Sequence, residues 1–246
     1  MEHNEKRLKI LIANDDGIES EGLRRLAAMA AKLGDVYVCA PAGQCSAMSQ
    51  RLTIFNELIV REHKDFENVR AAYSVTGTPA DCVKVALMHL LPEKPDYVFS
   101  GINFGYNTGY DIAYSGTIGA ALEAVMSGIP AIAFSAQHDG TFDVAEEYML
   151  PLAKELIAKG QGVGEVWNIN FPGCALDELK GIKYDTKICR ADLYENYYQE
   201  SILPDGARCL KVGATPLSME NAEEGTDVRA VLENYISVGK VKSMVL

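Results

Sequence analysis

The sequence predicts an α/β protein whose core is a doubly wound, mostly parallel sheet. One observation is a repeated unit in which a short apolar segment ends at a polar or proline-containing junction and a helix-like segment follows. A second is that these apolar segments alternate little, which is typical of strands buried on both faces. A third is that the pattern changes after Pro172. We therefore expect a core domain over residues 1–172 and a smaller β-rich lobe with extended hairpins over 173–246.

The first part of the chain begins with the apolar run Ile10 to Ala13, which predicts a strand. An amphipathic helix is expected next, followed by a second strand and a loop of small and polar residues. Two more strands around a charged turn complete this part. The expected ranges, in order, are helix 21–33, strand 35–41, loop 42–50, strands 52–60 and 69–75, and turn 61–68.

The middle of the chain repeats the alternation of strand and helix. Thr78 followed by Pro79 predicts a capped helix start, because proline fits the first helical position. Beyond Pro172 we expect strands over 181–210, an acidic surface turn over 222–227 and a last strand near 235–238. The other expected ranges are a helix to residue 91, strand 95–100, a Gly- and Asn-rich loop 101–109, helix 118–126, strand 131–135 and helix 142–158.

Composition limits the partners that we expect. The chain has 246 residues, of which 48% are hydrophobic and 23% charged, and its formal net charge is −11. This charge repels nucleic-acid backbones and anionic membrane surfaces. It does not exclude a small phosphate ester, provided that a cation or a helix terminus offsets the charge locally. We therefore expect no nucleic-acid polymer and no membrane as partners.

Cysteine usage and the chain start indicate a reduced, cytoplasmic protein. The six cysteines form no C-x-x-C pair, which argues against a zinc cluster or a thioredoxin-type site. Cys39 and Cys82 lie in apolar segments and are expected to be buried thiols. Residues 1–7 lead into the first strand without an apolar signal region, and no apolar run is long enough to span a membrane.

Two adjacent carboxylates follow the first strand, in the stretch Asn14-Asp15-Asp16-Gly17. Carboxylates at the end of a buried strand are costly unless a cation binds there, so we infer a divalent metal. Gly17 supplies the backbone freedom of a tight turn. The alternative is that Asn14, Asp15 and Asp16 cap the helix and form an Asx turn.

Three strand ends carry oxygen ligands: Asp15 with Asp16, then Ser46, then Asn103. Ligands of a doubly wound sheet gather at the carboxyl ends of its strands, so these junctions can converge. Carboxylate, hydroxyl and amide oxygens suit Mg²⁺, Mn²⁺ or Ca²⁺ better than zinc. The alternative is that Ser46 is solvated in its loop and Asn103 is a turn residue.

A candidate oxyanion cradle lies within residues 101–117. Asn107, together with the backbone N–H groups of Ser115, Gly116 and Thr117 at a helix start, can bind an anion. The segment is neither a Walker loop nor a dinucleotide fingerprint. The alternative is an ordinary Ser-capped helix after a flexible loop.

Together these motifs resemble the SurE family of survival-protein phosphatases, which act as 5′- and 3′-nucleotidases. The matching motifs keep the family's order over most of the chain. They are Asn14-Asp15-Asp16-Gly17-Ile18, Ala40-Pro41 with Ser46, Thr76 to Val83, Ser100-Gly101-Ile102-Asn103 with Gly105, Asn107 and Gly109, Tyr114 to Thr117, Ala120, Glu123, Gly128-Ile129-Pro130 and Trp167 to Pro172.

The resemblance implies a Rossmann-like catalytic core, one divalent metal ion per subunit and hydrolysis of nucleoside monophosphates. It also implies that extended elements of the C-terminal lobe make homodimer or homotetramer contacts. By motif position, the implied metal ligands are Asp15, Asp16, Ser46 and Asn103. The residues that would hold the phosphate are Asn107, Ser115, Gly116 and Thr117.

The expected reaction is attack of a metal-activated water on a phosphate monoester, with Asp15 orienting or deprotonating that water. The four histidines lie outside the motifs, which argues against a histidine base. One alternative is an aspartyl phosphate on Asp15 or Asp16, as in haloacid-dehalogenase-like phosphatases, although the D-x-D-x-[TV] pattern is absent. Another alternative is a non-catalytic nucleotide sensor that uses the same cradle.

Overall fold

The protein is built on a central nine-stranded sheet, in a computed structural model that describes residues 7–138, 141–191, 194–216 and 222–246. The strand order is β3-β4-β2-β1-β5-β6-β7-β11-β8. The strands are β1 (Leu8–Ala13), β2 (Gly34–Pro41), β3 (Val60–Glu62), β4 (Ala71–Val75), β5 (Tyr97–Phe104), β6 (Ala131–Ala136), β7 (Glu165–Phe171), β8 (Ile182–Thr186) and β11 (Ile236–Lys242).

Six neighbouring strands, from β4 to β7, run parallel, which confirms the predicted doubly wound, mostly parallel sheet. Antiparallel pairs occur at its borders, where β3 pairs with β4 and β11 pairs with β7. The parallel strands are apolar on both faces, and the buried side chains of β1 illustrate this, since Ile10 and Ile12 pack on one face and Leu11 and Ala13 on the other.

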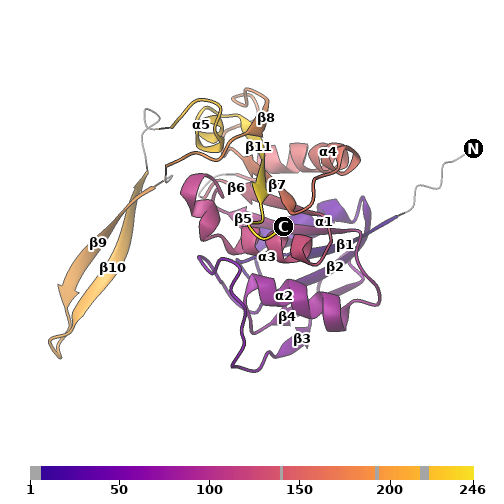
Figure 1. The fold of residues 1–246 in the computed structure, drawn as a ribbon, viewed down its shortest axis with the longest axis horizontal. Coiled ribbons are helices and arrows are strands. Elements are labelled where there is room, and N and C mark those ends of the chain that lie inside the picture. The colour runs from indigo at the N-terminus through magenta and orange to yellow at the C-terminus, as the bar shows by residue number, and fades with distance from the viewer. Residues whose placement is uncertain (1–6, 139–140, 192–193, 217–221) are drawn as a thin grey trace, which may run out of the picture.

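Helices cover both faces of the sheet (Figure 1). The helices α1 (Glu21–Ala30) and α4 (Asp143–Lys159) contact each other and pack on one face. On the other face, α2 (Pro79–Val85) packs against α3 (Gly116–Met126). Two short helices follow α2 and β5, namely the π-helix η1 (Ala86–Leu90) and the 3₁₀-helix η2 (Gly109–Ala113), and α5 (Asp227–Leu232) precedes β11.

The strand order reverses between β1 and β5. From β1 the chain passes to β2 on one side, whereas β5 lies on the other side of β1. In open α/β sheets the crevice at such a switch point, outside the carboxyl ends of the strands, is where ligands bind. The residues that directly follow β1 and those that end β5 therefore define where the site must be sought.

The structure corrects three predictions about individual elements. The expected strand 52–60 is wrong, because an edge strand of only three residues, β3, forms at the start of the predicted turn. Strand β5 continues to Phe104, so part of the expected loop 101–109 belongs to the sheet. The expected acidic surface turn forms, with residues 223–225 exposed, but its last residue, Asp227, begins α5 and is buried. Tertiary contacts with neighbouring strands and loops determine the extents of these three elements. A local sequence pattern does not specify such contacts.

The C-terminal segment is β-rich, as expected, but part of it extends the central sheet. Strand β11 pairs with β7, and β8 pairs with β11. The division of the chain at residue 172 stays a prediction. Strands β9 (Tyr194–Ile202) and β10 (Arg208–Pro216) form a separate antiparallel hairpin, which projects away from the body (Figure 1).

Two further observations concern the sequence predictions about thiols and membranes. Cys39 and Cys82 are buried and unbridged, as expected. Among the described residues, no helix has the length and apolarity needed to cross a membrane. The expected lack of a signal region falls mainly on residues 1–6, which lie outside the described residues.

Candidate active site

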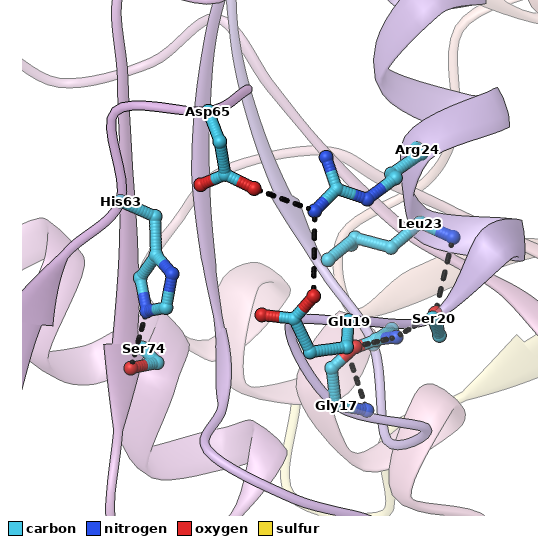
Figure 2. A network of polar contacts seen from close by, with 9 residues as sticks. Gly17, Glu19, Ser20, Leu23, Arg24, His63, Asp65 and Ser74 are labelled. Carbon is cyan, nitrogen blue, oxygen red and sulfur yellow. Dashed lines mark hydrogen bonds and ion pairs between the residues drawn. The ribbon is translucent and has the colours of Figure 1, made fainter.

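The turn after β1 is held by side chains other than the two carboxylates. Asn14 is buried, its Oδ1 accepts the Gly17 N–H at 3.2 Å, and its Nδ2 donates to the Gly17 carbonyl and to Ser20 Oγ. Gly17 has φ +95°, a conformation that L side chains rarely adopt. Ser20 caps α1 by accepting the Leu23 N–H (Figure 2). The Asx turn and the cap therefore exist, but neither uses Asp15 or Asp16.

The turn is also tied to the neighbouring segment by an arginine. Arg24 on α1 contacts Glu19 and Asp65, and Figure 2 shows its guanidinium between the two carboxylates. His63 in the same neighbouring segment contacts Ser74 of β4 at 2.8 Å. Arg24 therefore joins the turn at Glu19 to the segment that contains Asp65. The side chains of Asp15 and Asp16 make their contacts elsewhere, with α3 and with the end of β5.

Asp15 lies directly against the start of α3. Thr117 Oγ1 donates to Asp15 Oδ1 at 2.7 Å. A Cβ on Gly116 would come within 2.8 Å of Asp15 Cβ, so only glycine permits this close approach. Ser115 caps the helix by accepting the Ile118 N–H at 3.0 Å. The fold therefore brings Ser115, Gly116 and Thr117 to the carboxylate, from 100 residues further along the chain.

Asp16 faces the end of β5. Its Oδ2 accepts the backbone N–H of Phe104 at 3.1 Å. The preceding residue, Asn103, donates its side-chain N–H to the Gly105 carbonyl at 2.7 Å. An amide that uses its nitrogen in this way offers its oxygen to a cation. Asp16 and Asn103 thus lie at two adjacent strand ends joined by one hydrogen bond.

Ser46 reaches the site through the loop 42–50. The N–H of Cys45 donates to the Asp15 carbonyl at 2.7 Å, and Ser46 follows as an exposed residue. The far end of this loop is anchored on α3, where Gln50 donates to the buried carboxylate of Glu123 at 3.0 Å. Lys84 of α2 pairs with the same carboxylate. Residues that are distant in sequence therefore hold the loop over Asp15.

Asn107 is held by a buried polar cluster rather than by a flexible loop. Its side chain donates to Ser135 Oγ at 2.8 Å, and its backbone N–H donates to Asn170 Oδ1. Asn168 and Asn170 both donate to its carbonyl. Sequence reasoning missed the roles of these two asparagines, although their i, i+2 spacing on an apolar strand is a usable signal, because it places both on one face.

The electrostatics of the carboxylate pair are unusual. Burial raises the pKa of Asp15 from 3.8 to about 6, opposed by the Thr117 hydrogen bond and assisted by the charge of Asp16. Burial also raises the pKa of Asp16, although the Phe104 N–H and the charge of His138 lower it. In the described part of the chain neither carboxylate pairs with a lysine or arginine. Two partly desolvated carboxylates without a lysine or arginine partner are what a metal site presents before binding.

The donor set fits a hard cation. Among the described residues no three His, Cys, Asp or Glu side chains converge, so a metal at this position depends on hydroxyl and amide oxygens in addition to the two carboxylates. Asp15 and Asp16 supply the charge, while Ser46 and Asn103 lie one residue from backbone contacts to them. Oxygen-only sets of this kind bind Mg²⁺, Mn²⁺ or Ca²⁺.

The fold and the site define a doubly wound α/β protein with a carboxylate pair and a helix N-terminus facing each other at the sheet's switch point. Comparison with known proteins identifies the family. The model of the family described as "Survival protein SurE" matches residues 10–195, and this chain belongs to the SurE family.

Relatives match the chain over nearly its whole length. A protein of Clostridium botulinum (strain ATCC 19397 / Type A) named "5'-nucleotidase SurE" is 39% identical over 237 residues, which cover 94% of this chain and 91% of the relative. A protein of the same name from Christiangramia forsetii is 36% identical, covering 97% and 92%. The crystal structure of the SurE protein from Aquifex aeolicus superposes with a TM-score of 0.80 at 36% identity, covering 95% and 93%.

Proposed function

We propose that this chain is a metal-dependent phosphomonoesterase that hydrolyses nucleoside 5′- and 3′-monophosphates to nucleoside and phosphate. The observation that carries the proposal is the pair of the buried Asp15 and the half-buried Asp16, which no lysine or arginine neutralises in the described structure. Asp15 lies against the N-terminus of α3. The relatives named "5'-nucleotidase SurE" support the substrate class.

The metal ligands in this proposal are Asp15, Asp16, Ser46 and Asn103. When bound there, a hard divalent cation supplies positive charge to the phosphoryl oxygens and lowers the pKa of a water molecule. We propose Mg²⁺, Mn²⁺ or Ca²⁺ as this cation, one per subunit.

Asp15 is placed to hold and accept a proton. Its Oδ1 is fixed by the Thr117 hydroxyl, so the carboxylate keeps one orientation. In the metal-free protein burial raises the pKa of this carboxyl to about 6, so it is ionised at neutral pH and ready to bind a cation. In the proposed reaction Asp15 orients the attacking water and takes its proton while the water oxygen bonds to phosphorus. The P–O bond to the nucleoside breaks, and the nucleoside oxygen leaves as a hydroxyl after taking a proton from solvent.

The start of α3 is placed to bind the phosphoryl oxygens. The N–H groups of Gly116 and Thr117 lie in the first turn and have no carbonyl partner within the helix. The Thr117 N–H also hydrogen-bonds to the Asp15 carboxylate, so the Gly116 N–H is the donor of this turn that is left for a phosphoryl oxygen. The Ile118 N–H is taken by Ser115 Oγ. The side chain of Asn107 has a second N–H besides the one donated to Ser135, and this hydrogen is available to the phosphate. Such donors stabilise charge that develops on the equatorial oxygens.

The experiment measures phosphate release from a nucleoside 5′-monophosphate. We expect activity to be lost in EDTA and restored by Mn²⁺ or Mg²⁺. The Asp15→Asn variant should stay inactive at every metal concentration, although it folds. Nucleotide binding by the wild-type protein without turnover in the presence of Mn²⁺ or Mg²⁺ would instead favour a nucleotide sensor. Full activity in a metal-stripped sample would contradict the proposal.

We further propose a homodimer or homotetramer that works in the cytoplasm. The support is the hairpin β9–β10, whose two strands pair only with each other among the described strands. Tyr197 and Tyr198 on this hairpin are exposed, Tyr198 by 69%, while the side chain of Tyr194 lies outside the described structure. Because an isolated two-stranded hairpin is marginally stable in water, packing against another subunit would stabilise it.

A further inference from the structure

A cavity opens beside Asp16, and its lining does not include the residues proposed to bind the phosphate. Its volume is about 260 Å³, and it is lined by Asp16, Ser20, Glu21, Gly22, Phe104 and Phe142. Whereas Asp15 is covered by Gly116 and Thr117, Asp16 faces this cavity through the residue that ends β5. The cavity therefore continues from the proposed reaction centre toward α1 and α4.

Aromatic rings form one side of this cavity. Phe104 is 41% exposed, although it belongs to a strand of the central sheet. Its ring lies 4.6 Å from that of His138, at 48°, and 6.3 Å from that of Phe142, at 38°. Because the Phe104 N–H donates to Asp16, the backbone that carries this ring is held beside the carboxylate. A partly exposed aromatic surface thus lies beside a proposed metal ligand.

The size of the cavity limits what it can hold. Sites that bury a whole drug-sized ligand occupy about 300–1,000 Å³. A cavity slightly below this range suits part of a ligand, such as a ring system. In the proposed function the phosphate binds at the start of α3, next to Asp15, so the ribose and base must extend away from that helix. Phe104 borders one such direction, because its N–H donates to Asp16, the residue that follows Asp15.

The side chains of Glu21 and Ser20, which line the cavity, already have partners within the protein. Stacking on the aromatic rings is therefore the main interaction that the cavity offers to a base. Glu21 pairs with Arg25 on the same helix. Ser20 Oγ accepts hydrogen bonds from Asn14 and from the Leu23 N–H. Base–aromatic stacking does not need edge contacts and tolerates every base, because each base has a π-face.

We infer that Phe104, together with His138 and Phe142, forms the nucleobase subsite of this protein. The inference rests on the proposed nucleotidase function and adds to it where the base binds and by which interaction. Phe104 is the principal stacking residue, because it lines the cavity and its backbone N–H joins it to Asp16. The subsite favours substrates that carry an aromatic base over those that carry the sugar phosphate alone.

The test compares adenosine 5′-monophosphate with ribose 5-phosphate, which lacks the base, at saturating Mn²⁺. The readout is the ratio of the two kcat/KM values, since this ratio cancels changes at the shared phosphate site. We expect the wild-type protein to prefer the nucleotide. Phe104→Ala should lower the ratio about tenfold, within the range measured for loss of one stacked base, and Phe104→Tyr should retain it.

Two further variants complete the test. His138→Ala removes an exposed ring without opening the core, and it should lower the ratio in the same direction even if Phe104→Ala folds poorly. The matched control is Tyr114→Ala, an aromatic residue that is 62% exposed and lines a different cavity of about 780 Å³ beside Ser115. It should leave the ratio unchanged.

The outcomes separate the two levels of the argument. If the wild-type protein hydrolyses neither ester, the proposed function is wrong, and the subsite falls with it. If both esters are hydrolysed but Phe104→Ala and His138→Ala leave the ratio at its wild-type value, the subsite is wrong and the phosphatase stands. A ratio lowered by Tyr114→Ala instead would place the base in the larger cavity and overturn the inference.

Discussion

Asp15→Asn should stabilise the metal-free protein at pH 8 while it abolishes metal binding. In the folded protein Asp15 holds its proton up to about pH 6, whereas an ordinary aspartate releases it near 3.8. The stability of the metal-free protein therefore falls as the pH rises through this window and stays reduced above it. Two pKa units correspond to about 3 kcal/mol in the free energy of unfolding.

An asparagine at this position keeps the acceptor for the Thr117 hydroxyl but buries a new N–H₂ group. An unsatisfied buried donor costs about 1–3 kcal/mol, so the net gain at pH 8 should be about 0–2 kcal/mol. For a chain of this size this gain raises Tm by up to about 8 °C. At pH 4 the wild-type carboxyl is largely protonated, and the gain should vanish or reverse. The difference in stability between Asp15→Asn and the wild-type protein should therefore change between pH 4 and pH 8. This change tests the pKa of Asp15 more directly than either value alone, because the cost of burying the amide is the same at both pH values.

Thermal unfolding in EDTA at pH 4 and pH 8, followed by circular dichroism, measures these differences. Repeating the pH 8 scans with Mn²⁺ should stabilise the wild-type protein, by about 2.7 kcal/mol at a metal concentration of 100 Kd, and should leave Asp15→Asn unchanged. Asp65→Asn is the matched control, because it removes the same charge from an exposed carboxylate whose pKa is lowered by Arg24, so it should give no gain at pH 8. Equal Tm shifts for Asp15→Asn at both pH values would refute the reasoning, as would normal stabilisation of this variant by Mn²⁺.

The remaining predictions concern the metal, the phosphate and the assembly. Asn103→Ala should weaken the metal affinity measured by titration calorimetry. Asn107→Ala should lower kcat at saturating metal by two to three decades, or roughly 2–4 kcal/mol in the activation free energy. Normal metal affinity and normal kcat in both variants would mean that this segment has only a structural role. Hydrolysis of a chiral, isotopically labelled phosphate ester should invert the configuration at phosphorus, and net retention would indicate an aspartyl phosphate. Light scattering at micromolar concentration should give a multiple of the chain mass, and deletion of 194–216 should reduce it; a single chain mass for the intact protein would contradict the assembly.

The loop predictions show why some structure could not be read from the sequence. The segment 101–109 contains glycines and asparagines, which are typical of loops, yet Asn103 and Phe104 pair with Ser135 and Ala136 of β6. The segment 52–60 is apolar enough for a strand, but of this segment only Val60 lies in a strand, β3, which pairs with the edge of β4. Pairing depends on which strand lies alongside, and no local pattern specifies that neighbour.

The sequence by itself determined the alternation of strands and helices, the carboxylate pair at the end of β1 and the Ser-capped start of α3. Each of these depends on residues that are close along the chain, so local propensity and hydrophobic pattern are sufficient. Only the tertiary structure decided that Thr117 holds Asp15, that Phe104 stands beside Asp16, and that buried asparagines of β7 fix Asn107. These contacts join strand ends separated by 60–100 residues, and their geometry depends on strand order and on side-chain burial, which arise only when the sheet has formed.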